Sequence, residues 1–414
     1  MKTIFISSFH GLIARNILLT PVLSTIQAEA KVVILAPIFK RDYFAKNFNK
    51  AEVIGIKKKL TVRDLFFRHW ALAASRTHGL YIKHRAELYQ GGSFFSFLAA
   101  VLPSRLGVAS RFGFWLLRLG NRLFFGKKNG LFARWFDQYQ PALVFSTDIQ
   151  NEWDVRLLEE AKCRGIKTVG MIRSWDNLST KGVIRAVPDI LIVNNEIIKN
   201  EAVDWNFIDE QKLKVVGIPH HARYQQKPPI SREEFLKSFG FEILNQKIIL
   251  FAPIGNRYIR NNTLDQKVLE ILSVLDANIL VRLPPGDRVD FKEIKNSRAK
   301  IVFDKTGVNF EGEDVKSNEI GEQDDLRLWH SVYYADVVIT GQSTIALDAA
   351  LCGKGSVIVA FDAKRRVYWD SVRRYYDYEY YQNIVKTGGV TMAKSPAELI
   401  VAVQKYLAEP HWNE

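Results

Sequence analysis

Cysteine is scarce in this chain of 414 residues, where Cys163 and Cys352 are the only two. Both stand in apolar, helix-like stretches, and neither has the spacing of a metal ligand. We therefore expect no disulfide framework, and a reducing, cytoplasmic location fits this usage. The eight histidines show no His-x-x-x-His spacing, so we expect no metal site and no cofactor.

Long hydrophobic runs are also missing. The N-terminal apolar stretch is too short for a signal peptide, and the uncharged run Phe94–Leu102 is too short to cross a bilayer. The remaining composition, with 47% hydrophobic and 25% charged residues, is that of an ordinary globular protein. Its length predicts two domains.

Acidic residues are absent from Leu88 to Phe136, although seven cations and eleven Phe and Trp residues lie there. Over residues 1–136, Lys and Arg outnumber Asp and Glu by 22 to 5, whereas the remaining chain holds 36 against 39. Cations beside aromatic residues on amphipathic helices suit an anionic membrane surface. The alternative is a helical subdomain with a solvated basic face. Nucleic-acid binding is not expected, because no recognisable binding module is present.

Short apolar runs alternate with helix-like stretches that end at glycine, which predicts doubly wound parallel sheets. Residues 217–232, rich in proline, form the best linker candidate. We expect a first domain over 1–220 with a basic helical insertion at 60–136, and a second domain over 233–395. The last segment, 396–414, is expected to be a helix that packs back on the first domain.

The most informative motif runs from Ala335 to Asp362: a buried strand, a polar turn, a helix and a second strand. Its turn is Gly341-Gln342-Ser343-Thr344, and free N–H groups at such a helix start favour phosphate. Asp348, one turn into the helix, is placed to reach a sugar hydroxyl. The alternatives are a plain N-cap for the turn and a solvated carboxylate for Asp348.

Two arginines follow strands of the second domain, Arg257 in the loop after residues 247–251 and Arg282 at the end of residues 278–283. The carboxyl edge of an open α/β sheet is where ligands bind, so both are candidate phosphate contacts. The alternative is that either pairs with the acidic stretch 304–325.

The first domain offers candidates for a catalytic base after its own strands. His10 lies in the first strand–helix turn, and a neutral imidazole accepts a hydroxyl proton near pH 7. Asp148 and Asp176 follow later strands, and either is a candidate base. Trp175 is a candidate sugar-stacking residue. The alternative for Trp175 is packing. His220 and His221, at the domain junction, are candidate contacts to the donor or acceptor, and the alternative is that the pair has no role.

This layout resembles the GT-B superfamily of glycosyltransferases, most of all bacterial surface-polysaccharide transferases and teichoic-acid glycerophosphotransferases. Their Arg-x-x-Pro element corresponds to Arg282-Leu-Pro-Pro285, and their Asp-Tyr-Ser-Ser-like turn to the turn 341–344. The family's His before that Pro is Pro284 here. The resemblance implies two Rossmann-like domains facing a cleft and a metal-independent transfer from a nucleotide sugar to a glycan or lipid-linked acceptor. A peripheral position at the inner face of the membrane follows from the basic region.

The layout also resembles the UDP-N-acetylglucosamine 2-epimerases, which share the fold. Their Gly-Asp resembles Thr147-Asp148. Their His-x-Glu-Ala-Gly and His-Arg-x-Glu loops correspond to Ile172-Arg-Ser-Trp-Asp176 and Ile254-Gly-Asn-Arg257, which lack the family's glutamates. Epimerisation is therefore the alternative activity, and a non-catalytic assembly subunit of the same fold is the other.

Overall fold

The computed structural model describes residues 1–11, 13–57, 59–287, 289–311 and 317–409. The chain divides into two compact units, Met1–His220 and His221–Glu414. Part of the predicted acidic stretch (312–316) and the end of the predicted C-terminal segment (410–414) lie outside the described residues.

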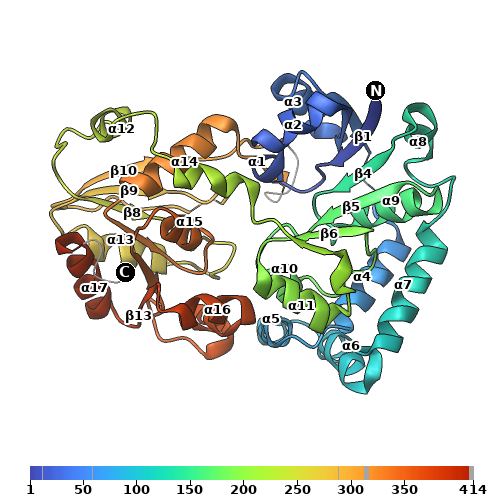
Figure 1. Ribbon diagram of the computed structural model, residues 1–414. Helices are drawn as coiled ribbons and strands as arrows, with labels where there is room; N and C mark the ends of the chain where they lie inside the picture. Colours follow the sequence, from blue (N-terminus) through green and yellow to red (C-terminus); the bar gives the residue numbers. More distant parts are fainter. Residues whose placement is uncertain (12, 58, 288, 312–316, 410–414) are drawn as a thin grey trace. The chain divides into compact units, whose positions relative to one another are not determined.

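The first unit is built on a seven-stranded parallel sheet with the strand order β3-β2-β1-β4-β5-β6-β7 (Figure 1). Because β1 pairs with β2 on one side and β4 on the other, the strand order reverses between β1 and β4. The strands are β1 Lys2–Ser7, β2 Ala30–Pro37, β3 Glu52–Ile56, β4 Leu143–Ser146, β5 Lys167–Met171, β6 Ile190–Val193 and β7 Leu213–Val215.

Helices connect these strands, and those from α4 to α8 form the predicted basic insertion between β3 and β4 (Figure 1). The α-helices of this unit are α1 Ile13–Ile17, α2 Pro21–Glu29, α3 Arg41–Asn47, α4 Val62–Ala73, α5 His78–Tyr89, α6 Phe94–Pro103, α7 Arg111–Phe125, α8 Ala133–Tyr139, α9 Glu152–Cys163, α10 Asn177–Thr180 and α11 Glu196–Asn206. Short helical turns η1 Ile38–Lys40, η2 Ser104–Val108 and η3 Glu210–Lys212 complete it.

Two details near the start of the chain differ from the sequence pattern. The pattern indicates a single helix over residues 13–26, but the structure has two helices, and the second begins at Pro21. Proline has no backbone N–H to donate to a preceding helical turn, so the first helix cannot continue through it. Thr20 caps the second piece by accepting a bond from the Val22 N–H. The edge strand β3 is an element that the sequence analysis did not predict.

The second unit contains a six-stranded parallel sheet with the order β10-β9-β8-β11-β12-β13, reversing between β8 and β11. Its strands are β8 Ile248–Phe251, β9 Asn278–Arg282, β10 Lys300–Asp304, β11 Val337–Thr340, β12 Ser356–Val359 and β13 Thr391–Ala393. Four of them, β8, β9, β11 and β12, are fully buried along their length, as expected for central parallel strands.

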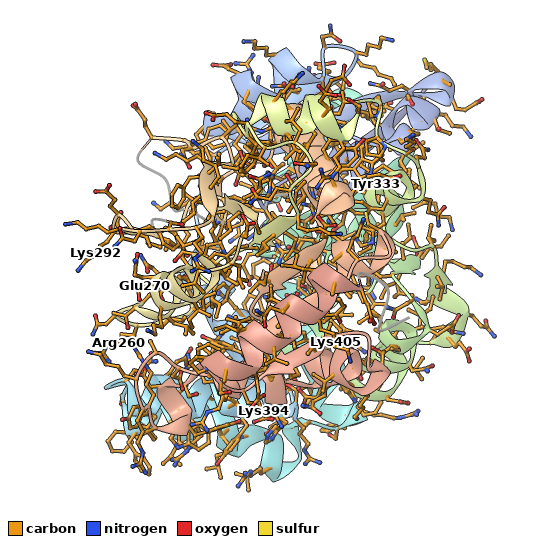
Figure 2. All side chains as sticks on the ribbon, turned by 90° about the vertical axis from the view of Figure 1, so that its left-hand side faces the viewer. Arg260, Glu270, Lys292, Tyr333, Lys394 and Lys405 are labelled. Atoms are coloured by element: carbon orange, nitrogen blue, oxygen red, sulfur yellow. The ribbon has the colours of Figure 1, made fainter. Side chains whose placement is uncertain are left out.

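The helices of the second unit pack on this sheet. They are α12 Arg232–Ser238, α13 Leu264–Leu272, α14 Glu322–Tyr334, α15 Ile345–Leu351, α16 Glu379–Thr387 and α17 Pro396–Ala408, with the turns η6 Tyr368–Asp370 and η7 Val372–Asp377; η4 Pro219–Gln225 spans the unit boundary. Helix α17 packs against β12, β13 and α13 of its own unit, and Figure 2 labels Lys405 on this helix and Lys394 just before its start. Its predicted packing on the first domain stays a prediction.

The predicted linker 217–232 leads from one unit to the next, and α12 begins at its end with a capping box between Ser231 and Glu234. Within the described ranges, no helix is both long enough and apolar enough to span a bilayer.

Candidate functional site

The carboxyl ends of β1 and β4 in the first unit are joined by a buried polar network. Thr147 donates its N–H to the Ser7 hydroxyl at 3.0 Å and its own hydroxyl to the Ser7 carbonyl at 2.7 Å. Ser146 donates to Asp154 at 2.8 Å, and Ser7 donates to the same carboxylate. This network holds the two strand ends where the strand order reverses, which is the position of ligand sites in open α/β sheets.

Two of the predicted catalytic residues stand on either side of this reversal. His10 follows β1, and Asp148 follows β4. The His10 Nδ1 lies 2.5 Å from the Gly11 carbonyl and donates to it, which leaves Nε2 as the acceptor nitrogen. Neighbouring Ser8 is fully buried, and its hydroxyl has no partner among the described residues.

The environment of His10 disfavours its protonation. Burial is the largest cause, the charge of Arg173 is the next, and together with Lys181 and Lys40 they lower the His10 pKa to about 2, against the opposing bond to Gly11. The imidazole is therefore neutral at pH 7, as expected. It is also a much weaker proton acceptor than an ordinary histidine, which the sequence alone did not indicate.

Asp148 pairs with a cation that the sequence analysis missed. Arg173 Nη1 lies 3.2 Å from Asp148 Oδ2, and the carboxylate side chain is only 6% exposed. Arg173 is the second residue after β5, inside the loop that carries Trp175 and Asp176. Its position after a parallel strand is the signal that could have identified it.

Asp176 lies in the same loop and is half-buried. Its Oδ2 accepts a bond from the Thr180 hydroxyl at 3.3 Å, and its charge acts on Lys181. Burial is the largest cause that lowers the Lys181 pKa, Arg173 adds to it, and Asp176 and Asp148 oppose it. The predicted residues after β1, β4 and β5 therefore share one electrostatic environment with Arg173 and Lys181.

Lys40 is a further residue that sequence reasoning missed. It ends the turn after β2 and is fully buried, although lysine is almost never fully buried. Its charge lowers the His10 pKa, which places it near the same strand ends. The edge of the first sheet thus combines three cations with two carboxylates and a neutral imidazole, which suits an anionic ligand. Trp175 is half-buried in its loop, and His220, at the end of the unit, is buried.

In the second unit, the loop after β8 is held by two aspartates. Asp265 accepts the N–H groups of Ile254 and Gly255, both at 2.9 Å, and Asp287 accepts those of Asn256 and Arg257 at 3.2 and 3.1 Å. Gly255 has φ +93°, and a Cβ there would lie 2.3 Å from the Asp287 carboxylate, so only glycine fits.

Arg257 itself is exposed in this loop. Its guanidinium lies 5.7 Å from the centre of the Tyr258 ring, a cation–π contact. Because the loop's backbone N–H groups are already engaged by carboxylates, a phosphate at this strand end would be met by the guanidinium.

The turn after β11 lies against this loop. A Cβ on Gly341 would be 2.5 Å from Ile254 Cγ1, so the approach of the two loops requires glycine. The buried Tyr381 supports the turn by donating its hydroxyl to the Gly341 carbonyl at 3.1 Å. Helix α16, which carries Tyr381, therefore helps to position the predicted donor turn.

One side chain of the turn caps the following helix, and two others make no capping bond. Ser343 Oγ accepts the Ile345 N–H at a long 3.4 Å, whereas Thr344, at the N-cap position, makes no side-chain cap bond and is exposed. The Gln342 Oε1 is buried without a hydrogen-bond partner among the described residues. Capping thus accounts for Ser343 and leaves Thr344 and Gln342 for a ligand.

Asp348 is 2% exposed, so the alternative of a solvated carboxylate is wrong for this residue. Its Oδ1 lies 3.7 Å from Nε2 of the half-buried His221. Its negative charge also helps burial to raise the pKa of the Cys352 thiol to about 12. His221 thus lies beside the helix that follows the turn, and its contact with a ligand stays a prediction.

Arg282 pairs with a residue of the acidic stretch 304–325, which is the alternative given for it above. Its side chain is 6% exposed and pairs with Asp304, while Nη2 donates to the Asp324 carbonyl at 2.9 Å. Arg327 reaches the same Asp304 at 2.9 Å. The guanidinium therefore ties β9 to β10 and the start of α14, and its predicted phosphate contact stays a prediction.

Comparisons with known proteins establish the fold. No established family matches the sequence, and no curated protein does. Among solved structures, a putative UDP-N-acetylglucosamine 2-epimerase from Listeria monocytogenes matches with a TM-score of 0.53 at 11% identity, over 98% of this chain and 88% of that one.

Two further structures extend this likeness. The UDP-GlcNAc 2-epimerase from Neisseria meningitidis, solved bound to UDP-GlcNAc, gives a TM-score of 0.52 at 14% identity, over 98% and 93% of the two chains. The glycotransferase of kitacinnamycin gives 0.51 at 12% identity, over 99% and 91%. The chain is thus an α/β protein with two Rossmann-like sheets, of the GT-B fold, and this part of the prediction is confirmed.

Proposed function

We propose that the protein is a nucleotide-sugar-dependent glycosyltransferase that moves a glycosyl group onto a hydroxyl of a surface-polysaccharide or lipid-linked acceptor. The observation that carries the proposal is the pairing of a GT-B fold with polar groups at the strand-order reversal of each sheet. Solved structures of this fold include one bound to UDP-GlcNAc and one glycotransferase, which supports a nucleotide-sugar donor.

The second unit is proposed to hold the donor. The hydroxyl of Thr344 and the guanidinium of Arg257 would bind the diphosphate, whose charge requires cations and donors already in place. The Gln342 Oε1, which only accepts, would take a hydroxyl of the donor. His221, oriented by Asp348, would contact the nucleoside. No step in this account requires a metal ion.

The first unit is proposed to supply the base and the acceptor site. In the transfer, the acceptor oxygen forms a bond to the anomeric carbon, the bond from that carbon to the diphosphate breaks, and the nucleoside diphosphate leaves. Asp176 is the favoured base, because Asp148 is committed to Arg173 and the low pKa of His10 makes it a poor acceptor. His10 would then accept a hydrogen bond from the acceptor through Nε2.

Epimerisation of a UDP sugar is the second candidate, since epimerases recur among the structural matches. Against it, the loops 172–176 and 254–257 lack the glutamates of that family. A non-catalytic subunit of the fold is the third.

Product analysis after incubation with UDP-N-acetylglucosamine separates these functions. The proposal expects no isomerised sugar when the nucleotide sugar is supplied alone, and release of nucleoside diphosphate when an acceptor-containing membrane extract is added. Isomerisation without an acceptor would instead assign the epimerase. Nucleotide binding without any turnover would assign the non-catalytic subunit.

A cytoplasmic, membrane-peripheral position through residues 88–136 belongs to the same proposal.

A further inference from the structure

A pocket of about 360 Å³ opens in the first unit beside α7, away from the strand ends described above. Helix α7 packs on α9 (Figure 1). Residues of both helices line the pocket. Its charged lining consists of five cations and one carboxylate: Arg111, Arg118, Arg122, Lys162, Arg185 and Glu159. Such an excess of positive charge indicates a site for an anion.

Two half-buried cations of this pocket, Arg118 and Lys162, are fixed by hydrogen bonds. Arg118 donates to the Ile184 carbonyl at 3.1 Å and the Asn206 carbonyl at 2.6 Å, and Lys162 donates to the Val187 carbonyl at 2.8 Å. Neutral carbonyls hold both side chains without cancelling their charge.

Arg185 provides the most direct sign of a missing ligand. It is 4% exposed and donates through Nη2 to Glu152 at 2.7 Å. Its Nη1 is buried and has no hydrogen-bond acceptor among the described residues. A buried donor without an acceptor is costly, and an anionic oxygen in the pocket would satisfy it.

An exposed apolar stripe borders the pocket on the same helix. Phe112, Leu116, Leu119 and Leu123 follow helical spacing along α7 and are 67%, 38%, 37% and 65% exposed. Leu119 and the 54% exposed Trp115 also line the pocket, so the apolar stripe and the basic stripe share an edge. The neighbouring α6 and η2 expose Phe94, Phe95, Leu102 and Leu106.

We propose that α7 and α6 dock on an anionic phospholipid surface, and that the pocket beside α7 binds the phosphate of one lipid headgroup. A helix with an apolar stripe, an adjacent basic stripe and aromatic residues at their border is the pattern of interfacial membrane binding. This inference rests on the membrane-peripheral part of the proposed function and deepens it, while the nucleotide-sugar chemistry can be tested separately.

Charge complementarity selects the lipid surface over other occupants. No acid occurs from Leu88 to Phe136, which disfavours a partner that needs acids to pair with its own cations. A free phosphate would fill the pocket but leave the apolar stripe in water. Lipid accounts for both features at once.

The test is co-sedimentation of the full chain with vesicles made of equal parts phosphatidylglycerol and phosphatidylcholine. We expect binding that weakens with salt, and little binding to phosphatidylcholine alone. The double variant R111Q/R122Q removes two exposed cations of the pocket. It should weaken vesicle binding by roughly fivefold for each cation removed. The double variant F112S/L123S should weaken vesicle binding by about tenfold for each apolar side chain removed.

The matched control is the pair K46Q and K50Q, which removes two exposed lysines of the same unit outside this surface and should change binding little. Equal loss in the control, or unchanged binding in both test pairs, would overturn the proposal. Binding of inorganic phosphate that depends on Arg111 and Arg122, without any vesicle binding, would assign a free-phosphate site instead and contradict the lipid surface. Nucleotide binding should be unaffected in all these variants, so failure here and failure of the proposed function are distinguishable.

Discussion

Arg173 reaches Asp148 at 3.2 Å between the loops that follow β5 and β4. The same guanidinium is the strongest charge acting on His10, from the loop after β1. One cation thus links the three predicted loops of the first unit and determines how basic their candidate residues are. The predictions below follow from this arrangement and from its counterpart in the second unit.

Replacing Arg173 by Gln should raise the pKa of His10. The positive charge that most disfavours protonation of the imidazole is then removed, while the burial of the imidazole remains. Titration of the imidazole by NMR measures this directly. Turnover should fall by about 10²-fold, as when one preorganised charged contact is lost. K46Q, which removes a distant lysine, should leave the imidazole unchanged; an unmoved His10 pKa in the Arg173 variant would refute the electrostatic account.

Asp176→Asn should reduce transfer by roughly 10²- to 10⁴-fold, because a general base contributes about that much. Donor binding, measured by calorimetry, should stay the same. Asp42→Asn, at an exposed position on α3, serves as the control. If D176N keeps its activity and Asp148→Asn loses it, then Asp148 is the base instead.

Asp348→Asn should weaken donor binding, because His221 loses the charge that orients it. Two unit charges about 4 Å apart interact by roughly 1–4 kcal/mol between bulk water and a protein surface, so an affinity loss of roughly tenfold is expected. Calorimetry should show the loss in D348N and in His221→Ala, with the double variant no worse than either. Additive losses would mean that the two side chains act separately.

Gly341→Ala should disturb the donor turn, since its Cβ would be 2.5 Å from Ile254 Cγ1. Overpacking of this kind costs about 1–3 kcal/mol of unfolding free energy. Shortening the neighbour in the double variant I254A/G341A should recover donor binding. Gly389→Ala, at an exposed site where the nearest contact is a threonine hydroxyl at 3.3 Å, should be nearly neutral. No rescue in the double variant would show that the close approach to Ile254 is not what requires glycine at this position.

Glu160 should make the first unit less stable as the pH rises. Burial raises its pKa from 4.5 to about 7, so the folded state favours the protonated acid. The stabilisation is complete below pH 4.5 and is lost as the pH rises through about 7, by up to about 3 kcal/mol. Urea unfolding of Glu160→Gln across this range should show a flatter pH dependence than the parent chain. Parallel curves would contradict the raised pKa.

Much of the fold could be predicted because central parallel strands are continuous apolar runs, as in Ile248–Phe251 and Val337–Thr340. The edge strand Glu52–Ile56 lacks that pattern, since it is only partly buried and precedes a lysine run. Candidate residues after strands could be named because carboxyl ends of parallel strands share one edge.

Their partners could not be named, because ion pairing depends on tertiary distances. The sequence offers the stretch 304–325 as an alternative partner of Arg282 but does not single out Asp304, and nothing local indicates that Asp348 is buried beside His221. The fully buried Lys40 and the low pKa of His10 likewise depend on segments distant in the sequence.

The most direct test of the central claim is a thermal-shift measurement of the full chain with UDP, CDP, GDP and CMP. A donor site at the Gly341–Thr344 turn predicts that one of these nucleotides raises the Tm, with a stabilisation of about 2.7 kcal/mol at a concentration one hundred times its Kd. The G341A variant should lose that shift. No change in Tm with any of the four nucleotides would contradict the nucleotide-sugar function.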